Sequence, residues 1–173
     1  MRPSEAGAHP ILYPITMLKV TLIQLGKTHF KFVDTGFDEF ASRLKHYCKF
    51  ESLLIELPSR LKSNQIEQIK KNEADLLLAK IKPNDYIILL DENGKTLGSV
   101  AFAKHLEKLS IQHSQICFVI GGAYGFSQDV YNRANAKISL SEMTFSHQLI
   151  RLIFAEQLYR AFTIIKNEPY HHE

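Results

Sequence analysis

The chain has 173 residues, of which 45% are hydrophobic and 23% charged, and its formal net charge is +3. This composition fits one globular domain with an ordinary core, and no apolar run reaches the roughly 18 residues that a membrane-spanning helix needs. The mild positive charge permits a polyanionic partner without requiring one. Because the two cysteines, Cys48 and Cys117, form no CxxC pair, a reduced cytoplasmic protein is expected.

Residues 1–16 differ in composition from the rest of the chain. They contain Pro3, Pro10 and Pro14 and show no periodic pattern of apolar residues. They also lack the basic start and apolar centre of a secretion signal. We therefore expect a disordered N-terminal extension over residues 1–16 and a single domain over residues 17–173.

The domain opens with a strand pattern, a helix pattern and a second strand pattern. Alternating apolar residues predict a strand over residues 18–25. An apolar stripe at steps of three and four predicts a helix over residues 33–47. The apolar run at residues 53–57, stopped by Pro58, predicts the second strand.

A polar loop then leads to a helix predicted over residues 64–81. Asn64 followed three residues later by Glu67 has the spacing of a capping box. Residues 41–82 contain nine Lys/Arg and five Asp/Glu, a local net charge of +4. This charge suits either a solvated helix face or a surface that contacts phosphates.

The second half of the domain continues the alternation of strands and helices. Its apolar runs and helix-start signals predict, in order, a strand at residues 86–90 with a turn at 91–94, a helix over 99–109, a strand at 116–120, a helix over 127–134, a strand at 137–140 and a helix over 146–165. Strands that alternate with helices predict an α/β fold with a mostly parallel sheet flanked by helices.

The strand at residues 116–120 runs directly into the glycine-rich stretch Gly121-Gly122-Ala123-Tyr124-Gly125. α/β folds place ligands at the carboxyl ends of their strands, and glycine allows close approach of a ligand to the backbone. The alternative is a tight turn with nothing bound. The stretch matches neither the dinucleotide-binding pattern G-x-G-x-x-G nor a P-loop. We therefore do not expect it to bind the pyrophosphate group of a nucleotide.

The last predicted helix and the tail carry several groups suited to proton transfer or RNA contact. His147 and Arg151 are four residues apart and share one helix face, while Tyr170 and His171 lie in the tail. No carboxylate or cysteine set at ligand spacing accompanies the histidines, so no metal site is expected. Rings and cations on one terminal segment suit a base and its phosphates.

Taken together and in order, four motifs make the chain similar to the ribosomal large-subunit pseudouridine N3-methyltransferase family, a SPOUT-class family. The likeness runs from about Met17 to the end, and Ser146 stands where many members have proline. The motifs are Phe118-Val119-Ile120-Gly121-Gly122-x-x-Gly125, Leu140-Ser141-x-Met143-Thr144-Phe145-x-His147, Arg151 with Glu156-Gln157-x-Tyr159-Arg160-Ala161, and Pro169-Tyr170-His171-His172.

The resemblance implies a SPOUT-type α/β knot with a C-terminal trefoil knot, and a homodimer whose active sites are completed across the interface. It implies S-adenosyl-L-methionine as the cofactor and no metal. The cofactor-binding residues that it implies are Leu90, Gly121, Leu140, Ser141, Glu142, Met143, Thr144 and Phe145.

The implied activity is methylation of N3 of a pseudouridine in the intersubunit stem-loop of 23S rRNA, with the ribosome as substrate. The acceptor nitrogen must lose a proton, for which His147 and His171 are the candidates. Arg151 would stabilise negative charge or hold a phosphate, and Tyr170 belongs to the same candidate catalytic set. Two alternatives stay open at this point, a methyltransferase of the same class that acts on tRNA and a non-catalytic RNA-binding assembly factor.

Overall fold

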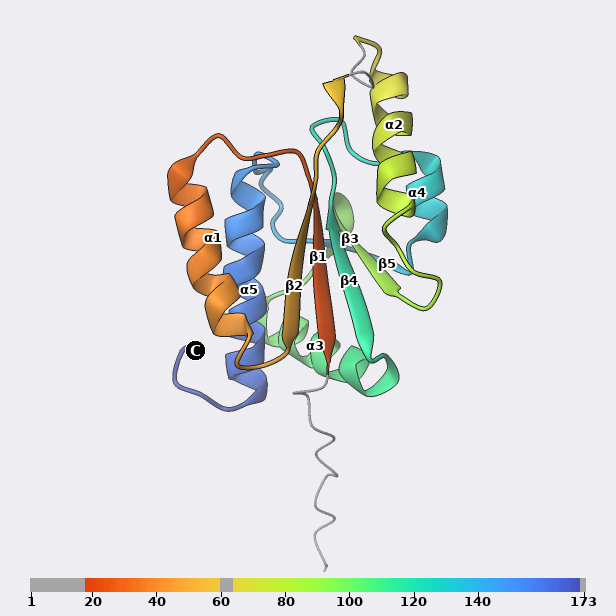
Figure 1. Ribbon diagram of the computed structural model, residues 1–173. Coiled ribbons are helices and arrows are strands. Elements are labelled where there is room, and N and C mark those ends of the chain that lie inside the picture. Colours follow the sequence, from red (N-terminus) through yellow and green to blue (C-terminus); the bar gives the residue numbers. More distant parts are fainter. Residues whose placement is uncertain (1–17, 60–63, 172–173) are drawn as a thin grey trace, which may run out of the picture.

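The computed structural model describes residues 18–59 and 64–171 (Figure 1). Five strands form one sheet in the order β2-β1-β4-β3-β5, and every neighbouring pair is parallel. The predicted disordered extension over residues 1–16 lies outside the described residues. The strands are β1 (Lys19–Leu25), β2 (Lys49–Ile55), β3 (Tyr86–Thr96), β4 (Gln115–Ile120) and β5 (Ala136–Ser139).

Helices cover both faces of the sheet, as the alternation of elements predicted. On one face lie α1 (Lys31–Leu44), α3 (Ser99–Gln112) and α5 (Leu149–Ile165), and on the other lie α2 (Ile66–Leu78) and α4 (Gln128–Arg133) (Figure 1). A parallel sheet covered on both faces needs apolar side chains on both, which explains why its central strands read as continuous apolar runs.

Strand β4 shows how one apolar run fills both layers of the core. Ile116, Phe118 and Ile120 pack in the layer under α1, α3 and α5, whereas Cys117 and Val119 pack in the layer under α2 and α4. All five are at most 3% exposed. Burying an aliphatic or aromatic side chain of this size contributes roughly 1.5–3 kcal/mol, so β4 is a principal source of stability for both layers.

Several element boundaries differ from those predicted. α5 begins at Leu149 and not at residue 146, so His147 precedes the helix. β2 begins at Lys49, four residues before the predicted start, where it pairs with Lys19 of β1 and where Lys19 forms an ion pair of 2.7 Å with Glu51. The capping-box prediction is wrong, because α2 begins at Ile66 and its N-cap residue is Gln65, one position beyond Asn64.

Strand β3 also departs from its prediction. β3 runs without a break from Tyr86 to Thr96, so the predicted turn at residues 91–94 is wrong. The pairing with β5 shifts register over these residues, and Ile138 pairs first with Leu90 and then with Lys95. Gly94 lies so close to this partner that a Cβ atom on it would be 2.6 Å from the backbone of Ile138. The close approach therefore requires glycine, and the excursion of residues 91–94 is built into the edge of the sheet.

Candidate functional site

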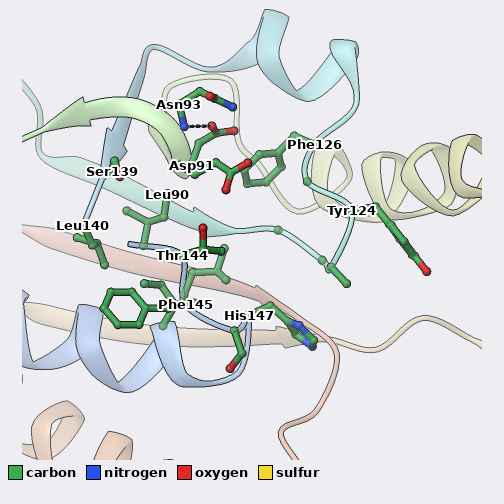
Figure 2. A pocket seen from close by; sticks show the side chains of 18 of the residues that line it. Leu90, Asp91, Asn93, Tyr124, Phe126, Ser139, Leu140, Thr144, Phe145 and His147 are labelled. Carbon is green, nitrogen blue, oxygen red and sulfur yellow. Dashed lines mark hydrogen bonds between the residues drawn. The ribbon is translucent and has the colours of Figure 1, made fainter. Parts of the chain in front are cut away.

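A half-open cavity of about 580 Å³ lies at the carboxyl ends of β3, β4 and β5 (Figure 2). Its walls come from the end of β3, the glycine-rich stretch after β4 and the segment that joins β5 to α5. This is the edge of the sheet where parallel α/β folds bind ligands. Seven of the eight predicted cofactor-binding residues line this one cavity: Leu90, Gly121, Leu140, Ser141, Met143, Thr144 and Phe145.

The eighth predicted residue, Glu142, is exposed and does not line the cavity. Its neighbours are held by short bonds within the loop, since Ser139 Oγ donates to the Ser141 carbonyl at 2.7 Å and the Met143 amide donates to Ser141 Oγ at 2.9 Å. In Figure 2, Leu90, Leu140, Thr144 and Phe145 gather at the centre of the site. The loop therefore supplies an apolar wall and exposed backbone at the same place.

Close neighbours leave no room for a side chain at two of the glycines after β4. A Cβ atom on Gly121 would lie 3.0 Å from the ring of Phe126, which itself lines the cavity, and one on Gly122 would lie 2.4 Å from Oε1 of Glu73 in α2. Gly125 has a φ of +74°, which disfavours other residues. A side chain at Gly121 would therefore disturb the wall of the cavity.

A polar wall of the cavity was missed by the sequence analysis. Tyr131 of α4 donates to Asp91 Oδ2 at 2.5 Å. The Asn93 amide donates to Asp91 Oδ1 at 2.8 Å (Figure 2). Burial, followed by the bond to Asp91, raises the pKa of Tyr131 to about 12. The sequence signal for Asp91 was its position directly after the apolar run at residues 86–90. Tyr131 lies 40 residues away, and no sequence signal pointed to it.

His147 lies at the rim of the cavity, just before α5 (Figure 2). Partial burial lowers its pKa, and the nearby charges of Arg151 and His29 lower it further. The imidazole is therefore neutral at physiological pH and able to accept a proton. Ser146, the residue before it, accepts a hydrogen bond from the Leu149 amide at 3.2 Å, so the serine helps to cap α5.

Arg151 does not line this cavity. Its side chain is 3% exposed, with Nε donating to the His147 carbonyl at 3.2 Å and Nη2 donating to the Leu25 carbonyl at 2.6 Å. It lines a second cavity of about 320 Å³ between the ends of β1 and β2 and the start of α1. His147 and Arg151, which were predicted to share one helix face, thus line two different cavities.

Tyr170 and His171 fold back beside the middle of α5. Tyr170 donates to Glu156 Oε1 at 3.1 Å, and His171 Nδ1 is 3.4 Å from Nη1 of Arg160, whose guanidinium lies over the Tyr170 ring. Figure 1 shows the chain after α5 turning back beside the helix. Glu156 and Arg160 follow Leu149 by seven and eleven residues, roughly 10 and 16 Å along the helix, and neither Tyr170 nor His171 lines the cavity, so one chain does not bring all four candidate catalytic residues together.

Neither a metal site nor a membrane segment is found in the part of the chain that the structure describes. Over residues 18–59 and 64–171, there is no group of three or more His, Cys, Asp or Glu side chains placed to hold a metal ion. Within the same ranges, every helix is too short or too polar to cross a bilayer.

Comparison with known proteins gives consistent matches. A family model described as "Predicted SPOUT methyltransferase" matches residues 18–171. The "Ribosomal RNA large subunit methyltransferase H" of Flavobacterium psychrophilum is 51% identical over 157 residues, covering 90% of this chain and 100% of its own. The protein of the same name from Christiangramia forsetii is 47% identical over 156 residues, covering 90% and 99%.

Among solved structures, the crystal structure of tRNA (m1G37) methyltransferase from Aquifex aeolicus is similar, with a TM-score of 0.50. The match covers 90% of this chain and 75% of that chain at 16% identity. At this identity the likeness is one of fold.

Proposed function

The chain belongs to the SPOUT methyltransferases and, within them, to the ribosomal RNA large subunit methyltransferase H family, and from this membership we propose that it methylates N3 of a pseudouridine in 23S rRNA, with S-adenosyl-L-methionine as methyl donor. The observation that carries the proposal is the convergence of seven predicted cofactor-binding residues on one cavity at the strand ends. Ribosomes as substrate imply a cytoplasmic protein.

The residues of the cavity fit this cofactor. A volume of about 580 Å³ is in the usual range for small-molecule sites. Leu90, Leu140 and Phe145 offer an apolar wall suited to adenine, and the tightly packed Gly121 leaves room where any side chain would intrude. The bound cofactor supplies a methyl group already activated on a sulfonium, so the protein has mainly to align donor and acceptor.

His147 is the candidate for the proton on N3 of the base. It lies at the rim of the cofactor cavity and its pKa is lowered, so it is neutral and able to accept that proton, directly or through a water molecule. When the methyl group is transferred, N3 would lose its proton and His147 would take it up. Tyr131 and Asp91 hold the wall of the cavity that faces this reaction.

The position of the tail supports a homodimer. Because Tyr170 and His171 contact the middle of α5 and do not line the cavity of their own chain, we expect them to act at the cavity of a second copy. Half-buried apolar side chains remain on α5 at Leu149 and Ile153, as expected of a helix with a further partner. Leu152, by contrast, contacts Gly36 of α1 within the chain.

The proposed activity is tested by incubating the protein with radiolabelled cofactor and, separately, intact ribosomes, purified rRNA and tRNA. Transfer to large-subunit rRNA in ribosomes, mapped to N3 of a pseudouridine by mass spectrometry, is expected. Transfer to tRNA instead would favour the tRNA alternative. RNA binding without transfer to any of the three would favour the non-catalytic alternative.

A further inference from the structure

The segment that joins β1 to α1 alternates cationic and aromatic residues. Lys27, His29 and Lys31 interleave with Phe30 and Phe32, and no acidic residue interrupts them. Phe30 is 47% and Phe32 is 63% exposed, although side chains of this kind are usually buried. Their ring centroids are 5.5 Å apart, so they form one small aromatic platform on the surface.

This segment lies beside the candidate active site. The His29 amide donates to Oε1 of Gln148 at 2.8 Å, and Gln148 directly follows His147 at the rim of the cofactor cavity. The charge of His29 also lowers the pKa of His147. Figure 1 shows the connection from β1 to α1 passing the start of α5 at the edge where the strands end.

Behind the segment lies the second cavity, which contains a buried cation. Arg151 is 3% exposed and takes part in none of the ion pairs found within residues 18–59 and 64–171. Asp34 lines the same cavity and favours the charge of Arg151 without pairing with it directly. A buried guanidinium without a close anion is costly, and an anion that enters the cavity would offset this cost.

Two of the five N–H donors of Arg151 are engaged by the carbonyls of His147 and Leu25. The cavity in front of the guanidinium has a volume of about 320 Å³ and is also lined by Lys27 and Thr28 of the aromatic segment and by Ser52. The space therefore offers cations and hydroxyl groups to a small anionic group. A phosphate of a nucleic acid backbone has this chemistry.

We propose that residues 27–32 and the Arg151 cavity together form a binding surface for unpaired nucleotides that flank the target base in the substrate RNA. Phe30 and Phe32 stack on bases, and Arg151, with Lys27 and Lys31, binds backbone phosphate. The proposal rests on the proposed function, because that function makes RNA the substrate. Interleaved rings and cations match the alternation of bases and phosphates in a single strand. A second copy of a chain with net charge +3 offers no such complementarity.

The test uses the double variant Phe30→Ala/Phe32→Ala in the full chain and measures its affinity for purified ribosomes by co-sedimentation. We expect affinity to fall about tenfold or more, as when stacked bases lose an aromatic partner. Calorimetric affinity for S-adenosyl-L-methionine and the sedimentation coefficient should stay as in the unchanged protein. Phe30→Tyr/Phe32→Tyr should bind normally, because it keeps both rings.

A matched control removes another exposed apolar side chain, which lies at the opposite end of the sheet, where the strands begin. Ile111, near the end of α3, is 68% exposed and lies by the amino end of β4. Ile111→Ala should leave ribosome affinity unchanged. Lys31→Gln should reduce the steepness with which affinity falls as salt rises, since one phosphate contact is lost.

Each result decides between the possibilities. Unchanged ribosome affinity in Phe30→Ala/Phe32→Ala overturns the proposed surface, whether or not the enzyme methylates RNA. Loss of the dimer, with ribosome affinity retained, would assign the platform to contact between copies of the chain and also overturn it. Failure of the unchanged protein to methylate any RNA would overturn the proposed function instead, and the ribosome-binding measurement would still test the surface.

Discussion

Glu73 places a carboxyl group against the turn at Gly122, with Oε2 buried and without a hydrogen-bond partner within the described chain. Burial raises the pKa of Glu73. A carboxyl group whose pKa is higher in the folded than in the unfolded protein destabilises the fold when it is ionised. The free energy of unfolding is therefore highest below the unfolded pKa of about 4.3, and it falls as pH rises through the raised folded pKa. Glu73→Gln removes this loss.

The expected result is that Glu73→Gln raises the melting temperature at pH 8 and has little effect at pH 4. Differential scanning calorimetry at both pH values measures this. Glu67→Gln on the same helix is the control, because the Glu67 side chain is 90% exposed. An equal shift of melting temperature at both pH values would show that ionisation of Glu73 is not the cause.

Gly121 is the residue at which added volume should act most directly on cofactor binding. Its Cβ position is already 3.0 Å from Phe126, so a larger side chain must displace that ring or enter the cavity. Gly121→Val is expected to weaken cofactor binding at least tenfold, measured by calorimetry, while circular dichroism stays close to that of the unchanged protein. Gly98→Ala, where the added Cβ meets nothing within 4 Å, is the control. Full affinity in Gly121→Val would place the cofactor elsewhere.

Among the contacts between secondary-structure elements, Phe118 packs β4 against helices α3 and α5. The ring is fully buried, 4.7 Å from Phe154 of α5 and 6.3 Å from Phe102 of α3, measured between centroids. Phe118→Ala should lower the free energy of unfolding by about 3–5 kcal/mol, measured by urea denaturation. Ile111→Ala, at an exposed site, should lower it by less than about 1 kcal/mol. A similar loss in both variants would contradict this role of β4.

The order and type of the elements could be predicted from sequence because the strands carry apolar runs or alternating apolar residues and α1 carries an apolar stripe. What sequence could not predict was set by partners far along the chain. β3 continues past Leu90 to Thr96, where Ile138 of β5 pairs with both Leu90 and Lys95. α2 begins after Asn64 despite a plausible cap, since tertiary packing overrides a weak local signal.

The same distinction applies to the candidate site. The loop around Met143 and the glycine at 121 were predicted because motifs in one stretch of sequence carry them. The contact of Tyr131 with Asp91 depends on packing between α4 and the end of β3, which no local pattern reveals. The trefoil knot and the dimer that the resemblance implies stay predictions.

For the whole molecule, separation of the tail from the cavity predicts that two chains share each active site. Deleting residues 170–173 should leave folding and cofactor binding nearly intact but remove methyl transfer, because Tyr170 and His171 do not line the cavity of their own chain. Single-turnover methylation of ribosomes measures the loss.

Mixing the tail deletion with Gly121→Val then tests the sharing. A mixed dimer contains one intact cavity facing one intact tail, so activity should return on mixing although neither variant is active alone. Denaturation and refolding of each variant separately is the control. Full methylation by the tail deletion, or no recovery in the mixture, would contradict a shared site.

The edge strand β5 has a consequence for how the protein opens. β5 has four residues and pairs only with β3, and its ladder is interrupted by the excursion of residues 91–94. The opposite edge strand, β2, pairs with β1 over seven residues without interruption. Local opening should therefore cost least at β5, and its amide hydrogens should exchange with deuterium sooner than those of β2. Since the cofactor loop follows β5 directly, a ligand in the cavity should slow exchange at residues 136–145 more than anywhere in β2, which mass spectrometry of deuterated peptides would detect.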